Sequence, residues 1–120
     1  SYKELEKCIG LYDRNRFLGH INKVELVKGD VMKTIPKYVK SNPSLVVSLL
    51  YLDFDLYEAT KVALKHFLPR MPKGAVIAFD EVGHPDWPGE TQAVIDSIGL
   101  NNLRLERCTF DTTRSFPVLE

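Results

Sequence analysis

The sequence has no excess of charge of either sign. Its 120 residues contain 16 lysines and arginines and 16 aspartates and glutamates, so the formal net charge is zero. A chain with neither a net field nor a local basic patch has no general attraction for nucleic acid or for an anionic membrane. We therefore expect no nucleic acid and no membrane among its partners.

Long hydrophobic runs and closely spaced cysteines are also missing. The longest apolar stretch, 45–52, is interrupted by Ser48 and is far shorter than the roughly 20 residues that cross a bilayer. The two cysteines, Cys8 and Cys108, do not form a C-x-x-C motif. We interpret them as free thiols of a cytoplasmic protein, with a disulfide between them as the alternative. No signal-peptide pattern opens the chain.

Apolar periodicity predicts strands that alternate with helices. Strands are predicted at 23–28, 45–52, 75–79, 103–110 and 115–119, and helices at 31–39, 56–68 and 90–98. This order is typical of a doubly wound α/β sheet that ends in an antiparallel hairpin. We expect a single α/β domain over residues 1–120.

Several positions refine this pattern. The 45–52 stretch is almost continuously apolar, which indicates a strand covered on both faces. Asp55, with Glu58 three residues later, is typical of a helix N-cap with a capping box. Pro36 should shorten or bend its helix, and Pro117 is expected on an edge strand.

Acidic side chains follow the predicted parallel strands. They stand at 29–30, 53–55 and 80–81. Because ligands bind outside the carboxyl ends of the strands in an open parallel sheet, we expect Asp53, Asp80 and Glu81 to lie close together. Clustered carboxylates repel one another, and a hard divalent cation compensates them most simply. In the alternative interpretation Asp55 caps its helix and the other acids are solvated.

Four stretches are distinctive in their order and spacing, namely LDFDLYEAT at 52–60, LPRM at 68–71, KGAVIAFDE at 73–81 and WPGE at 87–90. Together they resemble the macrocin O-methyltransferase family of S-adenosylmethionine-dependent enzymes. The resemblance extends over about residues 23–98 and implies a Rossmann-like sheet. It also implies O-methyl transfer to the hydroxyl of a sugar or another small molecule.

The resemblance further implies roles for individual residues. Asp53, Asp80 and Glu81 would hold Mg²⁺ or Mn²⁺ beside the acceptor hydroxyl. Gly29 and Asp30 would contact the adenine of S-adenosylmethionine in the complete enzyme. Asp53 would ligate the metal or take the proton of the hydroxyl, which the metal makes more acidic.

Two residues of the following loop are further candidates. His84 follows the acidic pair and is a second candidate for the catalytic base, although a lone loop histidine is commonly just solvated. Trp87 either lines an acceptor pocket or covers the core beneath the loop.

The chain departs from the family pattern at its beginning. Methyltransferases of this type carry a glycine-rich loop after their first strand, which holds the cofactor. Here Gly10, Gly19 and Gly29 are isolated, and no strand precedes the one at 23–28. We therefore expect the latter half of a longer enzyme. Without the first two strands, the 45–52 strand should have an unpaired edge that recruits a second copy or the missing half, unless the strand order is rearranged.

Two other functions compete with methyl transfer. A non-catalytic α/β fragment that binds a metal or a partner would explain the missing cofactor loop. Alternatively, Asp53 and Asp55 form the D-x-D motif of a haloacid-dehalogenase phosphatase, in which the first aspartate is the nucleophile. That motif requires Thr or Val two residues after its second acid, where this chain has Tyr57.

Overall fold

The computed structural model describes residues 1–120, which form two compact units, Ser1–Asp30 and Val31–Glu120. The first unit contains helix α1 (Tyr2–Arg14), which the periodicity did not predict. Its start is a capping box, in which the Ser1 hydroxyl accepts a hydrogen bond from the Glu4 N–H and the Glu4 carboxylate binds the Ser1 amino group. The S-x-x-E spacing at the start of the sequence was the signal for this helix.

The predicted strand at 23–28 is wrong. Residues 22–28 have no regular secondary structure, and no strand of the sheet pairs with them. Apolar side chains such as Val24 and Val27 are exposed there. A single extended segment leaves its backbone N–H and C=O groups to water, so it becomes a strand only beside another strand.

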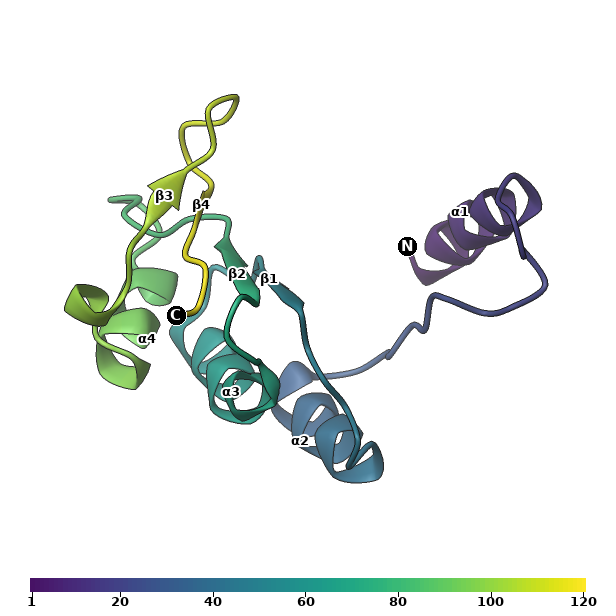
Figure 1. Ribbon diagram of the computed structural model, residues 1–120, viewed down its shortest axis with the longest axis horizontal. Coiled ribbons are helices and arrows are strands. Elements are labelled where there is room, and N and C mark those ends of the chain that lie inside the picture. Colours follow the sequence, from purple (N-terminus) through teal and green to yellow (C-terminus); the bar gives the residue numbers. More distant parts are fainter. The chain divides into compact units, whose positions relative to one another are not determined.

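The second unit has the predicted alternation of helices and strands (Figure 1). In chain order its elements are α2 (Val31–Ser41), β1 (Leu49–Leu52), α3 (Tyr57–Phe67), η1 (Leu68–Arg70), β2 (Val76–Phe79), α4 (Gly89–Ser97), η2 (Leu100–Asn102), β3 (Glu106–Arg107) and β4 (Ser115–Phe116). The four-stranded sheet has the order β1-β2-β4-β3, in which β1 and β2 are parallel and β4 is antiparallel to both of its neighbours. The fold is therefore α/β with a terminal antiparallel hairpin, as predicted.

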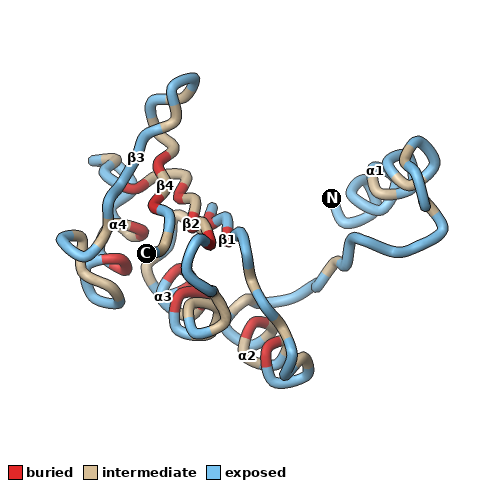
Figure 2. The backbone as a smooth tube through the Cα atoms, in the orientation of Figure 1, coloured by how far each residue is buried: buried red, intermediate tan, exposed pale blue.

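The core lies between one face of the sheet and the helices (Figure 2). Buried side chains alternate along β1 and β2, because successive residues of a strand point to opposite faces. These side chains meet apolar residues of α2, α3 and α4, which recur at helical spacing. The buried cluster consists of Ile35, Leu50, Leu52, Ala63, Leu64, Ile77, Phe79, Val82 and Val94.

Strand β1 lies at the edge of the sheet and pairs only with β2. Its other edge is unpaired, as the missing strands led us to expect. The prediction that 45–52 is covered on both faces is wrong, because Leu49 is 62% exposed and Tyr51 is also exposed. An apolar run indicates a strand whose two faces can both be covered. It does not tell whether this chain itself covers both of them.

Three local predictions need correction. Asp55 is not the N-cap of α3, since Leu56 occupies that position and no side chain caps the helix. Pro36 does not shorten α2, which runs to Ser41 beyond the predicted end at 39, and the alternative that it bends the helix stays a prediction. Pro117 does not lie on an edge, because β4 is between β2 and β3 and the Pro117 carbonyl accepts a hydrogen bond from Ile77 N–H at 3.2 Å. Pro117 is tolerated because it follows the last residue of β4 and is needed there only as an acceptor.

Candidate functional site

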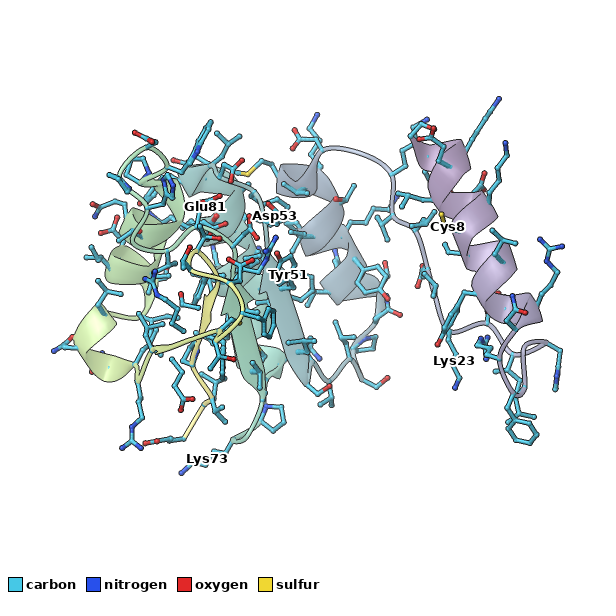
Figure 3. All side chains as sticks on the ribbon, turned by 90° about the horizontal axis from the view of Figure 1, so that it is seen from above. Cys8, Lys23, Tyr51, Asp53, Lys73 and Glu81 are labelled. Carbon is cyan, nitrogen blue, oxygen red and sulfur yellow. The ribbon has the colours of Figure 1, made fainter.

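The parallel register of β1 and β2 brings their acidic ends to one edge of the sheet. Leu52 pairs with Phe79, and the Asp80 N–H donates to the Leu52 carbonyl at 3.0 Å, so Asp53 and Asp80 leave the sheet at the same level. Figure 3 shows Asp53 and Glu81 at this end of the strands and Lys73 at the opposite end. The topology therefore gathers the carboxyl ends of both strands, where α/β sheets bind ligands.

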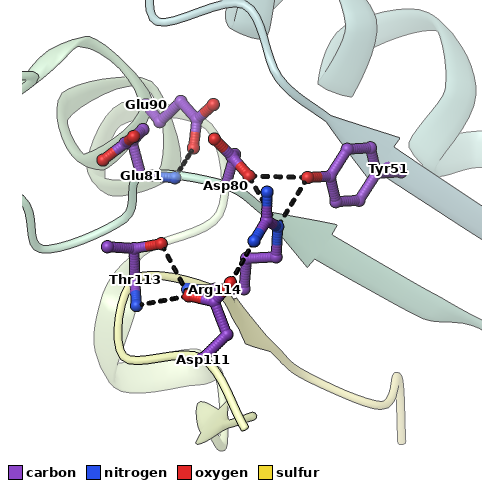
Figure 4. Close-up of polar contacts among 7 residues, drawn as sticks. All are labelled: Tyr51, Asp80, Glu81, Glu90, Asp111, Thr113 and Arg114. Carbon is purple, nitrogen blue, oxygen red and sulfur yellow. Dashed lines mark hydrogen bonds and ion pairs between the residues drawn. The ribbon is translucent and has the colours of Figure 1, made fainter.

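Asp80 is bound by an arginine that the sequence analysis did not single out (Figure 4). Arg114 Nε lies 2.8 Å from Asp80 Oδ1 and 3.0 Å from the Tyr51 hydroxyl oxygen. The Tyr51 hydroxyl donates to the same Asp80 oxygen at 2.6 Å. Tyr51 and Asp111 raise the pKa of Arg114 further above its usual value. In this structure Asp80 is thus neutralised by a cation from the chain itself.

Asp111 holds the turn that carries Arg114. Its Oδ1 accepts hydrogen bonds from Thr113 N–H and Thr113 Oγ1, each at 2.9 Å, and its other oxygen pairs with the Arg114 guanidinium. The bonds from Thr113 lower the pKa of Asp111 to about 2. Asp111 therefore stays ionised and holds the Arg114 guanidinium in place.

Glu90, in the first turn of α4, connects the two strand ends. Its side chain is fully buried, and Oε2 accepts a hydrogen bond from the Glu81 N–H at 2.9 Å. Burial, together with the charges of Asp80 and Asp55, raises its pKa to about 7 against the effect of that hydrogen bond. The backbone of Phe54 also donates to this carboxylate. Glu90 thereby ties the loop after β1 to the loop after β2.

Gly89 lets α4 approach the loop after β1. A Cβ atom at this position would lie 2.4 Å from the Asp55 carbonyl oxygen and 2.7 Å from the Tyr57 nitrogen, so only glycine fits. Asp55 itself has a φ of 58°, which few residues other than glycine, asparagine and aspartate adopt readily. The loop after β1 is thus held in one strained conformation by close packing.

Two buried carboxylate oxygens have no hydrogen-bond partner. They are Glu81 Oε2 and Glu90 Oε1. The His84 Nδ1 atom lies 4.0 Å from Glu81 Oε2 and accepts a hydrogen bond from the Asp86 N–H at 3.3 Å. The structure does not gather three or more His, Cys, Asp or Glu side chains into a group that could hold a metal ion.

The fold is similar to part of the fold of known O-methyltransferases. The apo structure of CalS11, a TDP-rhamnose 3'-O-methyltransferase of calicheamicin biosynthesis, superimposes on 97% of this chain with a TM-score of 0.91 and 35% sequence identity. This chain resembles half of an O-methyltransferase. It covers 50% of that CalS11 chain, and 46% of the chain in a second CalS11 crystal structure that matches equally well.

A third similar structure is that of the O-methyltransferase NovP. The match includes 95% of this chain and 44% of the NovP chain, with a TM-score of 0.70 and 21% identity. At that identity the likeness shows the fold alone. No protein-family profile and no curated protein sequence matches the chain.

Other predicted residues lie outside the strand ends. Gly29, with a φ of 139°, and Asp30 are exposed in the irregular segment that precedes α2, and their contact with a cofactor stays a prediction. Trp87 is exposed in the loop before α4. Both cysteines are free thiols. None of the helices combines the length and the apolar character that crossing a membrane requires.

Proposed function

We propose that this chain forms the acceptor half of an S-adenosylmethionine-dependent methyltransferase that methylates a sugar hydroxyl. The observation that carries the proposal is the 35% identity and the TM-score of 0.91 to CalS11 over nearly the whole chain. Carboxylates at the ends of two adjacent parallel strands lie where such a fold binds its substrates. CalS11 acts on a TDP-sugar, so we include nucleotide sugars among the candidate acceptors.

Asp53 is the residue that we assign to the proton of the acceptor hydroxyl. It is exposed at the end of β1, so a substrate can reach its carboxylate. His84 is less suited to this role, because its Nδ1 already accepts a hydrogen bond and the neutral ring then carries its proton on Nε2. When bound, S-adenosylmethionine would supply the methyl group for the acceptor oxygen. Gly29 and Asp30 are our candidates for holding its adenine.

A divalent cation fits the chemistry of this donor set. Carboxylate oxygens are the ligands that Mg²⁺ and Mn²⁺ prefer, and Glu81 Oε2 is buried without a partner. Asp80 becomes available only when Arg114 releases it. The Arg114 side chain is 43% exposed, so it can turn into solvent. We propose that Asp80 and Glu81, with Asp53 beside them, hold a metal that lowers the pKa of the acceptor hydroxyl.

Mass spectrometry of the complete enzyme tests both parts. We expect a mass increase of one methyl group on a sugar or nucleotide-sugar acceptor with S-adenosylmethionine, and a loss of that product when EDTA removes divalent ions. Added Mg²⁺ should restore it. Absence of product across an acceptor screen would contradict the proposed function. Product formation that is insensitive to EDTA would contradict only the proposed role of the metal.

We further propose that the open edge of β1 associates with a second copy or with another part of the enzyme. An unpaired strand edge offers a row of backbone donors and acceptors, and Leu49 adds exposed apolar area beside it. In sedimentation equilibrium this chain should self-associate, and Leu49→Lys should weaken the association. Ile95→Lys, at an exposed apolar residue of α4, is the matched control. A monomer at every concentration, or equal weakening by both variants, would refute association through the edge of β1.

A further inference from the structure

The pairing of β1 with β2 stops just before the two aspartates at the strand ends. Leu52 pairs with Phe79 in the last rung, so Asp53 and Asp80 occupy equivalent positions directly beyond it. The hydrogen bond from the Asp80 N–H to the Leu52 carbonyl closes this rung at 3.0 Å. Neither chain continues as a strand after that point. The separation of the two aspartates therefore depends on what holds the loops that follow them.

The carboxyl group of Glu90 joins the two chains beyond the last rung (Figure 4). Its Oε2 atom accepts a hydrogen bond from the Glu81 N–H at 2.9 Å, and the Phe54 N–H donates to the same carboxyl group. These two N–H groups belong to the peptide bonds directly after Asp80 and Asp53. One side chain is thus bonded to the residue that follows each aspartate.

The first turn of α4 holds both loops through three consecutive residues. Gly89 packs against the loop after β1 without room for a Cβ atom. Glu90 bonds to both loops, and the Thr91 hydroxyl oxygen accepts a hydrogen bond from the Gly83 N–H at 2.9 Å. Further along the helix, the fully buried Val94 fixes α4 in the core. A bridge built on a packed helix holds its contacts more precisely than one built on a loop.

Packing alone does not require a carboxyl group at position 90. The Glu90 side chain is fully buried, and its Oε1 atom has no hydrogen-bond partner. The charges of Asp80 and Asp55 act against its ionisation. An apolar side chain of similar length would fill the same space without the free-energy cost of removing a carboxyl group from water. What an apolar side chain lacks is an acceptor for the two backbone N–H groups.

We propose that Glu90 is a positioning residue for methyl transfer, which holds Asp53 and Asp80 at the separation that the acceptor hydroxyl requires. The inference rests on the proposed function and adds to it a residue that acts through the aspartates without touching the substrate. A displacement of about 1 Å at a reacting group can lower the rate about 100-fold. The loss should therefore appear in kcat, since the cofactor contacts are assigned to Gly29 and Asp30.

Amide hydrogen exchange of this chain, followed by NMR, tests the bridge without cofactor or methyl transfer. In Glu90→Ala the N–H groups of Phe54 and Glu81 should both exchange about 10- to 100-fold faster, as expected for loss of a hydrogen bond to a charged group. Thr91→Val should accelerate exchange at Gly83 and leave the other two N–H groups unchanged. Faster exchange at Glu81 alone would overturn the proposal, because Glu90 would then hold only one of the two loops.

Steady-state kinetics of the complete enzyme tests the consequence for the reaction. Glu90→Ala should lower kcat about 100-fold and leave the KM for S-adenosylmethionine unchanged. Glu90→Gln should lose less, because glutamine keeps one acceptor oxygen. Two matched controls should keep the kcat of the wild type. Thr91→Val removes one hydrogen bond from the same helical turn, and Val94→Ala destabilises α4 from the core.

Three kinetic outcomes would overturn the proposal. An equal loss of kcat in Glu90→Ala and Val94→Ala would trace the effect to general destabilisation. A wild-type kcat in Glu90→Ala, or in Glu90→Gln if the alanine variant does not fold, would remove Glu90 from the reaction and leave the proposed function intact. Absence of methylated product from the wild-type enzyme would instead contradict the proposed function itself, and the role of Glu90 with it.

Discussion

Asp53→Asn is expected to lower kcat of the complete enzyme by about 10²- to 10⁴-fold, the usual contribution of a general base. Asparagine has nearly the shape of aspartate but does not accept the proton of the acceptor hydroxyl. Because Asp53 is exposed beyond the end of β1, the substitution leaves the core untouched. Single-turnover methyl transfer, followed by mass spectrometry, measures the effect directly.

Asp86→Asn is the matched control, since Asp86 is an exposed aspartate in the loop after β2. It should retain the rate of the wild type. The melting temperatures of both variants should also stay close to that of the wild type. A catalytic rate in Asp53→Asn that equals the control would remove Asp53 from the reaction and return His84 to consideration as the base.

The stability of the fold should fall between about pH 4.5 and pH 7 because of Glu90. Burial raises the pKa of Glu90 in the folded state from 4.5 to about 7. The folded state therefore binds the proton more tightly than the unfolded state. This contribution is fully present below pH 4.5 and is lost as the pH rises through 7. At 1.36 kcal/mol for each pKa unit, the loss is on the order of 3 kcal/mol.

Glu90→Gln should flatten this dependence, because glutamine keeps an acceptor for the Glu81 N–H and does not ionise. Urea unfolding at a series of pH values measures the free energy of unfolding for both proteins. Glu58→Gln, at an exposed glutamate of α3, is the control and should keep the slope of the wild type. If Glu90→Gln and the wild type lost stability in parallel over this range, the protonation of Glu90 would not be the cause.

The elements that sequence predicted well are those with strong local signals. α2, α3, α4 and β2 follow from apolar periodicity and from the glycines and prolines between them. The segment at 23–28 has the composition of a strand but lacks a neighbouring strand. Composition does not show whether such a neighbour is present. The strand predicted at 103–110 is too long for a related reason. Only Glu106 and Arg107 find partners in β4, and the chain then turns.

The candidate site divides in the same way. Acids that end adjacent parallel strands meet at one sheet edge by topology alone, so Asp53 and Asp80 could be placed from sequence. Arg114 could not, because it meets Tyr51 across 63 residues of chain through the antiparallel addition of β4. The role of Glu90 depends on how deeply α4 buries its first turn, which W-P-G-E alone does not reveal.

The hairpin that carries Arg114 has little apolar support. β3 is two residues long and exposed, and Phe110 at the turn is 88% exposed. Segments with few buried contacts open locally at a fraction of the free energy of global unfolding. Arg114, the cation that pairs with Asp80, is therefore held by one of the least protected parts of the chain. Amide hydrogens around the turn should exchange with solvent long before those of β2, and the charge at the strand ends will fluctuate on the timescale of that opening.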